Sequence, residues 1–591
     1  MRLAGGERRG GLAYEITAMP SSLGVVLALL PAALSTCDVP ARLGAEFIDW
    51  PYLTENVLPR GIPWVAAPAG GAAATDALGW PLEDALTVVN YMLPSQLDPL
   101  HFLPIVFGDH YFDFVGAADA IITGPPGNVT LLNSSFDALR WVTSGYIRVL
   151  STATLPAIWM GASGTRRAPG AARGTGFSAA RLLRPGVDPA ASPPAGGGIA
   201  FLPAVATATA PFSQLRTMIS TYNGFTNPAL QYSSPDHGVL QWSDRRALSD
   251  ALWTDGAPSP KQFGVPWEYV VSLAQATRKA AWVCVPPQAT GGGGGGGDAG
   301  SYVGELGALL AAGSPATGGR GLPVGSRLYV EHGNEVWLRG DGKSASNAYN
   351  EAAAADEVAR GVQPWDNDGC GDAFIWGLRR HVARLHNISA TLAAAAAVAG
   401  SGILIQPVLG WDAALVPALA PVLAWHAVYA GVPARAWLAG IAVNTYTPVG
   451  LVAGNDAEFY YAALKSASQA AAANRSAAAS AAAAQGVRLM AYEGNGVGIA
   501  FGPGAQGEQA MMIEATRAQG AAGVLLNDYE LHWQALGGCE HNWFALASQY
   551  DVYQWGLVED LRALNTPRFQ AIASLAARGQ PEVGPGAPPR P

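Results

Sequence analysis

The sequence has little charge for its length. Only 13% of its 591 residues are charged, and the formal net charge is −9. Basic residues occur at most in short pairs, such as Arg8-Arg9 and Arg166-Arg167. Proteins that bind nucleic acid present clustered lysine and arginine. We therefore expect no nucleic-acid partner.

Cysteine is also scarce, and its spacing excludes the usual zinc sites. The four cysteines, Cys37, Cys284, Cys370 and Cys539, form no CxxC pair. No His-x-His or His-Glu-x-x-His motif is present, so we expect neither a metal nor a cofactor. Cys284 lies in an apolar stretch and is predicted to be an inert buried thiol. Cys370 and Cys539 lie in polar segments and could pair in an oxidising compartment.

The first 36 residues are predicted to be a secretory signal peptide. The stretch "SSLGVVLALLPAALST" (21–36) is an apolar core followed by small residues, too short and too interrupted by proline for a membrane span. An uncleaved anchor and a start at Met19 are the alternatives. Four glycosylation sequons agree with export, and they begin at Asn128, Asn133, Asn387 and Asn474. We expect a secreted, extracellular or cell-wall protein with no stable membrane span after signal cleavage.

Short apolar runs alternate with helical patterns over most of the chain. Eight runs are predicted to be strands: 43–50, 214–221, 280–286, 327–335, 402–411, 439–447, 487–495 and 523–531. Helical stretches such as 266–280 and 374–386 separate most of them. Eight strands that alternate with helices favour an α/β fold with a parallel sheet, the (β/α)₈ or TIM barrel.

Segments of a different kind interrupt and flank the predicted barrel. Residues 37–100 would hold the first barrel strand and its flanks, and residues 201–578 the remainder of the barrel. Between them, residues 101–200 have short β-like runs and turn signals. They predict a β-rich insertion between the first and second barrel strands, with an irregular loop region as the alternative. The Ala-rich stretch 466–485 is interpreted as a helix, and residues 579–591 as a disordered tail.

Polar residues crowd the predicted ends of several strands, where catalytic residues of such barrels lie. "RLYVEHGNEVW" (327–337) contains Asn334-Glu335, and "AYEGN" (491–495) contains Glu493. The two glutamates end strands that lie three steps apart around the ring, so they should face each other across its cavity. A facing carboxyl pair suits cleavage of a glycosidic bond, with one acid protonated and the other ionised.

These motifs resemble those of clan A, the retaining (β/α)₈ glycoside hydrolases, in which Asn-Glu ends strand four and Glu ends strand seven. "YVEHGNEVW" and "AYEGN" are similar in particular to a secreted subgroup with "VEYSNEVWN" and "AYEGG". Further segments resemble that subgroup: 47–50, 79–81, 215–218, 264–274 and 282–287.

The resemblance implies a role for five residues. Glu335 would be the general acid/base and Glu493 the nucleophile. Asn334 would hydrogen-bond the sugar 2-hydroxyl. Tyr446 would hold the nucleophile, and Arg216 would pair with it and keep it ionised.

The sequence departs from the subgroup beside both glutamates. His332-Gly333 stands where the subgroup has Tyr-Ser, Leu338 replaces an Asn, and Asn495 replaces the second Gly of "AYEGG". These changes leave both glutamates in place and bear on the fit of the substrate.

Several candidate residues also have a purely structural interpretation. Alternation along the fourth strand turns His332 towards the helix layer and Glu331 inward. We therefore expect His332 to be a hydrogen-bonded core residue, and Glu331 to form a salt bridge with Arg216. Trp533, at the end of the predicted eighth strand, is a candidate substrate-binding residue. It could form a sugar platform with two further tryptophans, or each could be a core residue: Trp411 and Trp543.

The leading hypothesis is a secreted retaining glycoside hydrolase, an enzyme that cleaves a β-linked polysaccharide or glycan by a two-glutamate double displacement. The alternative is a carbohydrate-binding or extracellular-matrix protein on a barrel scaffold, with catalysis weakened or lost. The sequence leaves the sugar, the linkage, endo or exo action and the oligomeric state open, because the first three depend on loops.

Overall fold

The structure of the chain is a computed structural model. It describes residues 42–46, 53–61, 63–90, 107–150, 157–218, 239–253, 264–291, 300–338, 345–447, 449, 456–495, 506–548, 550 and 554–579. The predicted signal peptide and all but the first residue of the predicted tail lie outside the described residues.

Eight parallel strands close into a barrel. In the order in which they pair, they are β1 (Arg42–Glu46), β10 (Gln214–Arg216), β11 (Ala280–Val285), β12 (Arg327–His332), β13 (Leu404–Trp411), β14 (Gly440–Asn444), β15 (Arg488–Glu493) and β16 (Glu540–Trp543). β16 pairs with β1, which places Glu540 opposite Arg42 and closes the ring. The predicted α/β barrel is confirmed, and seven of the eight strands begin within two residues of the predicted position.

The prediction of the eighth strand is wrong. Residues 523–531 belong to the helix α9 (Gln519–His532), and the eighth strand is β16, whose four residues are all buried. A short apolar run does not distinguish a strand from a segment of buried helix. Val524, Leu525 and Tyr529 are buried along α9 with the spacing of one helical face.

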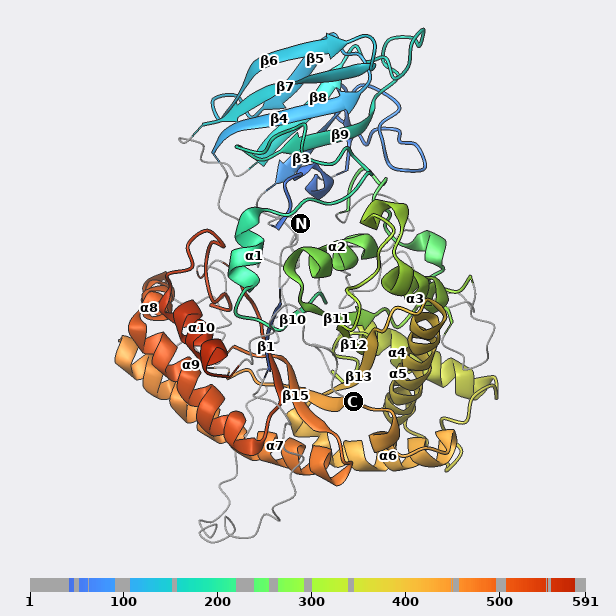
Figure 1. The fold of residues 1–591 in the computed structure, drawn as a ribbon, viewed down its shortest axis with the longest axis vertical. Coiled ribbons are helices and arrows are strands. Elements are labelled where there is room, and N and C mark those ends of the chain that lie inside the picture. The colour runs from blue at the N-terminus through green and yellow to red at the C-terminus, as the bar shows by residue number, and fades with distance from the viewer. Residues whose placement is uncertain are drawn as a thin grey trace, which may run out of the picture.

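Helices surround the barrel, as the alternation of strands and helices requires (Figure 1). Besides α9, they are α1 (Pro203–Thr209), α2 (Trp267–Thr277), α3 (Tyr302–Ala312), α4 (Ala345–Ala359), α5 (Ala373–Val398), α6 (Val416–Ala430), α7 (Ala457–Ala484), α8 (Gln506–Arg517) and α10 (Pro567–Gly579). The Ala-rich stretch predicted as a helix is most of α7. The main core lies between the two layers, where Leu328 and Val330 of β12 belong to the same buried cluster as Leu385 and Ile388 of α5.

A β-sandwich is inserted between β1 and β10. One sheet has the order β2 (Val65–Ala66), β3 (Ala85–Asn90), β8 (Ala157–Ser163), β5 (Ala120–Gly124). The other has the order β6 (Val129–Asp137), β7 (Val142–Val149), β4 (Gly108–Val115), β9 (Ser178–Leu183). Val89 and Ile158 from the first sheet share a separate core with Phe112 and Ile147 from the second. The predicted β-rich insertion is therefore present, and its first strand begins at Val65, ahead of residue 101.

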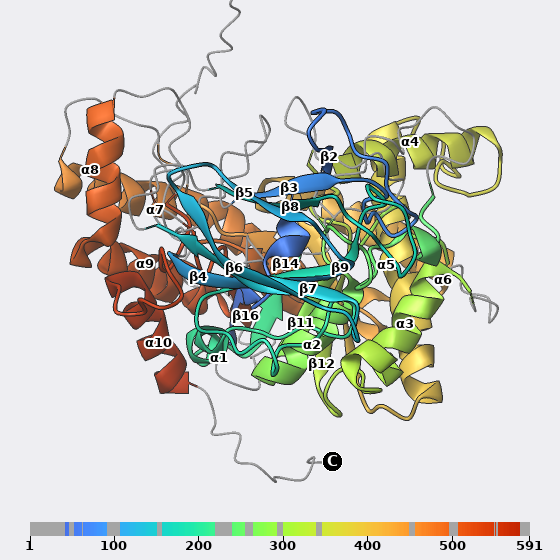
Figure 2. The ribbon, with the colours of Figure 1, turned by 90° about the horizontal axis from the view of Figure 1, so that it is seen from above.

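The sandwich sits over one end of the barrel. The insertion leaves the barrel after the C-terminal end of β1, and α1 leads back from it to the start of β10. Figure 1 shows the sandwich above the barrel, and in Figure 2, seen from above, its sheets lie in front of the barrel strands. The sandwich therefore stands on the side where the strands end, which is the side that carries active sites in barrels of this kind.

The cysteines differ in part from expectation. Cys284 is a fully buried thiol outside any disulfide, as predicted, and Cys370 is free and exposed. Cys539 is disulfide-bonded. Since Cys370 is free, the suggested pairing of Cys370 with Cys539 is wrong.

One helical segment among the described residues passes the length and composition test for a membrane span. It covers residues 413–430, with a mean hydropathy of 1.6, and 22% of it is buried. The segment includes α6, which packs against α5 and α7 in the helical layer of the barrel.

Candidate active site

The C-terminal ends of the strands gather three carboxylates around one buried arginine. Arg216, the last residue of β10, is fully buried. Its Nη1 donates to Oε2 of Glu46 at 2.7 Å and to Oε1 of Glu493 at 2.5 Å, and its Nε donates to Oε1 of Glu331 at 2.8 Å. These acidic residues come from β1, β15 and β12. The expected salt bridge between Glu331 and Arg216 is confirmed.

Burial has the largest effect on the pKa values of Glu46 and Glu331. It raises the pKa of Glu46 to about 8, although Arg216 acts in the opposite direction. Burial also raises the pKa of Glu331, whose Oε1 accepts a further hydrogen bond from Trp282 Nε1 at 2.5 Å. One guanidinium cannot neutralise three buried carboxylates, and an unpaired buried charge is costly. With this pKa, Glu46 is the group that keeps a proton at neutral pH.

Glu493 ends β15 with a donor on each of its oxygens. Oε1 accepts from Arg216, and Oε2 accepts from the hydroxyl of Tyr446 at 2.8 Å. Tyr446 follows β14, and burial together with the neighbouring Glu493 raises the pKa of its hydroxyl well above the usual range. The tyrosine therefore stays protonated and acts as the donor. Both contacts expected from the family resemblance are present.

Glu335 lies just past the end of β12, in a turn with two left-handed residues. Gly333 has φ +67°, and Glu335 itself has φ +50°. A side chain in this region costs about 1–2 kcal/mol, and such strain is concentrated at functional sites. At position 333 a Cβ atom would lie 2.8 Å from Cγ of Pro287. The turn therefore requires a glycine at position 333.

Tyr492 contacts both Glu335 and Arg216, and the sequence did not indicate this. Its hydroxyl donates to Oε1 of Glu335 at 3.2 Å, and its ring centroid lies 5.1 Å from the guanidinium carbon of Arg216. Strict alternation would turn Tyr492 and Glu493 to opposite faces of the sheet. The register between β14 and β15 shifts here, so that Asn444 pairs with Glu493 and Tyr492 is left as an extra residue.

The environment of Glu335 favours its protonated form. Burial and then the negative charge of Glu493 raise the pKa of Glu335 to about 8, while the hydrogen bond from Tyr492 acts in the opposite direction. The residue as a whole is half-buried, so a ligand can reach it. A carboxylic acid of this kind is protonated at neutral pH and can donate a proton.

Asn334 precedes Glu335 and also binds the central arginine. Its Oδ1 accepts from Nη2 of Arg216 at 2.7 Å, which fixes the orientation of the amide. Within the described part of the chain, its amide nitrogen has no hydrogen-bond partner. Asn334 therefore has a positioned donor left for a ligand.

The structure brings five of the six predicted site residues together: Arg216, Asn334, Glu335, Tyr446 and Glu493. Trp533 lies elsewhere. It follows α9, is fully buried, and packs with its ring centroid 5.4 Å from that of His541. Its predicted position depended on the wrong eighth strand. The other two platform candidates are also fully buried core residues: Trp411 and Trp543.

Different aromatic residues lie beside the site. Phe544, directly after β16, meets Tyr446 edge to face with 6.2 Å between ring centroids. Trp555 packs against Phe544 at 4.9 Å. Sequence reasoning missed Phe544 because β16 itself was not recognised.

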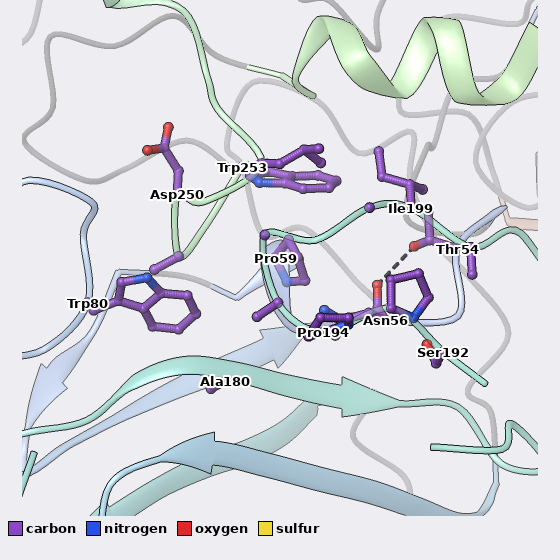
Figure 3. Close-up of a pocket in the computed structure, with 17 residues that line it drawn as sticks. Thr54, Asn56, Pro59, Trp80, Ala180, Ser192, Pro194, Ile199, Asp250 and Trp253 are labelled. Atoms are coloured by element: carbon purple, nitrogen blue, oxygen red, sulfur yellow. Dashed lines mark hydrogen bonds between the residues drawn. The ribbon is translucent and has the colours of Figure 1, made fainter. Parts of the chain in front are cut away.

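A small cavity lies where the sandwich joins the barrel. Trp80, Asp250, Trp253 and Asn56 are among the residues that line it (Figure 3). Its volume is about 40 Å³, which is room for a few water molecules and too little for a sugar ring. The cavity also lies apart from the carboxylate cluster, so we assign it to packing between the two domains.

Comparison with known proteins gives weak structural likeness only. No family model matches the chain, and no curated protein matches it. Among solved structures, a GH51 arabinofuranosidase from Xanthomonas axonopodis pv. citri aligns at 12% identity and a TM-score of 0.33 over 63% of this chain and 65% of that chain. A 4-O-α-L-rhamnosyl-β-D-glucuronidase from Fusarium oxysporum 12S aligns at 13% identity and a TM-score of 0.31 over 63% of each chain.

A family 1 β-glucosidase from Thermotoga maritima aligns at 9% identity and a TM-score of 0.27, over 63% of this chain and 84% of that chain. The chain thus spans just under two thirds of the length of the first two structures. TM-scores this low indicate a weak likeness of fold and nothing about function.

Proposed function

We propose that the protein is a secreted retaining glycoside hydrolase that acts on a β-linked polysaccharide or glycan. The observation that carries the proposal is the contrast between two neighbouring carboxyl groups. Glu493 accepts hydrogen bonds on both oxygens, whereas burial and Glu493 itself raise the pKa of Glu335 to about 8. Glycosidic bond cleavage requires this division between a nucleophile and an acid.

In the first step Glu493 attacks the anomeric carbon and forms a glycosyl-enzyme. Glu335 donates its proton to the departing glycosidic oxygen. In the second step Glu335, now a carboxylate, takes a proton from water, and that water releases the sugar from Glu493. Tyr446 and Arg216 hold the two oxygens of Glu493 in position for the attack.

Substrate binding is assigned to the remaining donors and aromatic faces at the mouth. The amide nitrogen of Asn334 is oriented by the bond between its Oδ1 and Arg216, and it would donate to a sugar hydroxyl next to the reacting carbon. Phe544 and Trp555 would contribute apolar surface against the sugar. The disulfide at Cys539 supports an oxidising, exported location, because such bonds are rare in reducing compartments.

The test is release of reducing sugar from a panel of β-glucans, xylans, mannans and galactans. Wild type should act on one class, and Glu493→Gln should lose activity by about 10⁴-fold or more, because no group is left to attack. Glu514→Gln on the exposed surface of α8 is the matched control and should retain activity. Product anomers followed by NMR should keep the β configuration.

Two outcomes would overturn the proposal. Activity that survives in Glu493→Gln would exclude Glu493 as the nucleophile. Binding of a polysaccharide without release from any substrate would favour the alternative, a carbohydrate-binding protein on the same scaffold.

A further inference from the structure

A second and larger cavity lies at the opposite end of the barrel. Its lining includes Arg42, Arg327 and Arg488, which are the first residues of β1, β12 and β15, and Glu540, the first residue of β16. Arg435, from the short helix just before β14, completes its charged lining. The cavity therefore opens at the N-terminal ends of the strands, while the carboxylate cluster lies at their C-terminal ends.

The charge of this cavity opposes that of the whole chain. Four arginines and one glutamate line it, in a protein whose net charge is −9. Burial raises the pKa of Glu540, while Arg488 and Arg42 act in the opposite direction. A walled cavity concentrates such a field, and the concentrated positive charge attracts anions.

Two of the four arginines are accounted for by the fold. Arg488 donates to Glu540 Oε1 at 2.5 Å, to Gln406 Oε1 at 2.8 Å and to the carbonyl oxygen of Ala439 at 3.1 Å. Arg42 lies close enough to Glu540 to act on its protonation. These two residues have a structural role in closing the bottom of the barrel.

Arg327 and Arg435 have no such role. Neither side chain makes a hydrogen bond or an ion pair with any residue in the described part of the chain. Arg327 is nevertheless half-buried at the cavity wall. An arginine held there without a partner retains all five of its N–H donors, in the planar fork that matches carboxylate, sulfate and phosphate oxygens.

The cavity has the size of a small-molecule site. Its volume is about 400 Å³, which falls in the range of ligand pockets and exceeds what a bare inorganic anion fills. Trp437 also lines it, is half-buried, and gives it an aromatic wall.

We propose that this cavity is a binding site for a small oxyanion ligand of up to monosaccharide size, in which Arg327 and Arg435 bind a phosphate, sulfate or carboxylate group. The site lies at the far end of the barrel from Glu335 and Glu493. It does not depend on the proposed hydrolase activity, and a ligand bound there is not the substrate.

Isothermal titration calorimetry on the full chain tests the site, with inorganic phosphate, glucose 6-phosphate, glucuronate and neutral glucose as probes. The anions should bind and glucose should not. The double variant Arg327→Gln/Arg435→Gln should weaken binding at least about 10-fold, since each bond to a charged group contributes substantially. Arg140→Gln, an exposed arginine of the sandwich, is the matched control and should bind as wild type does.

The choice of probes distinguishes a site for a free inorganic anion from a site for an anionic sugar. If glucose 6-phosphate binds more tightly than phosphate, the cavity binds the sugar ring as well as the oxyanion. If the two bind equally, the cavity binds the oxyanion alone. Both support the site. Absence of binding by every anion, or equal binding by wild type and the double variant, would overturn it. Glu493→Gln should bind the anions like wild type, and loss of binding there would place the ligand at the barrel mouth instead.

Discussion

Glu493 shares its arginine nitrogen with a second carboxyl group: Nη1 of Arg216 lies 2.5 Å from Oε1 of Glu493 and 2.7 Å from Oε2 of Glu46. The same guanidinium also donates through Nε to Glu331 and through Nη2 to Asn334, and a lysine ammonium cannot reach all four partners. Arg216→Lys should lower the free energy of unfolding by about 3 kcal/mol, because at least one buried carboxyl loses its partner. It should also lower kcat by about 100-fold or more, because Glu493 is no longer held in position. Urea unfolding and hydrolysis rates measure the two effects.

A second buried arginine separates loss of stability from loss of positioning. Arg181 of β9 pairs with Asp113 of β4 in the sandwich, outside the carboxylate cluster, and both residues are buried. Arg181→Lys should be destabilised to a similar extent while kcat per folded molecule stays within a few-fold of wild type. Equal loss of kcat in both variants would mean that Arg216 acts only through folding.

The pKa of Glu335 predicts the alkaline limb of the pH profile. Since the acid must be protonated, kcat/KM should fall as the pH rises through about 8. Glu335→Ala should lose activity on natural substrates but retain it on a dinitrophenyl glycoside, whose leaving group needs no proton. The alkaline limb should be absent from that residual activity. A limb that persists in Glu335→Ala would assign it to another group.

Tyr492 should also affect the pH at which the alkaline limb of the activity profile falls. Its hydroxyl donates to Glu335 and lowers the pKa that burial and Glu493 raise. In Tyr492→Phe the alkaline limb should therefore move to higher pH. Tyr446→Phe is the matched control, because that hydroxyl bonds to Glu493 and not to Glu335. It should lower kcat without moving the alkaline limb, and an unmoved limb in Tyr492→Phe would contradict the assignment.

A buried histidine pair outside the site should make the fold sensitive to acid. His332 Nδ1 and His381 Nδ1 lie 2.9 Å apart, and burial lowers the pKa of His381 to about 4 and that of His332 well below 6.5. The folded state therefore binds fewer protons than the unfolded state below pH 6.5. Stability should fall as the pH drops from 6.5 towards 4, by roughly 1.4 kcal/mol per pH unit for each histidine.

The variant His332→Gln/His381→Gln isolates this contribution. Its free energy of unfolding, measured in urea, should depend less steeply on pH than that of wild type between pH 6.5 and 4. An unchanged slope would exclude the pair as its source. The comparison is needed because Glu46 and Glu335 work in the opposite direction: with pKa values of about 8, their contribution is lost as the pH rises from 4.5 through 8.

The sequence predicted the barrel well because seven strands are apolar runs bounded by turns, and the outward position of His332 followed from alternation. The eighth strand could not be predicted in this way. Its residues are Glu540, His541, Asn542 and Trp543, which carry no apolar period although all are buried. An apolar segment of α9 was predicted as the eighth strand in its place. Trp533 follows that segment and was therefore wrongly placed in the predicted site.

The residues of the candidate site also divide into those that one segment of sequence could predict and those that depend on a neighbouring strand. Glu335 and Glu493 were found from motifs at strand ends, and their partners Arg216 and Tyr446 from the resemblance. Tyr492 was missed because its orientation depends on a register shift against β14, which belongs to a pair of strands and not to one. Glu46 was missed because nothing in β1 alone shows that it reaches Arg216.

The pairing of β1 with β16 sets the order in which the chain can fold. Arg42 meets Glu540, so the last seam of the barrel joins segments from near the two ends of the chain. Contacts this distant in sequence form slowly. During synthesis the sandwich, whose strands are close in sequence, can fold before β16 is available to pair with β1. A chain that stops before β16 leaves β1 and β15 as open sheet edges, which are prone to aggregate.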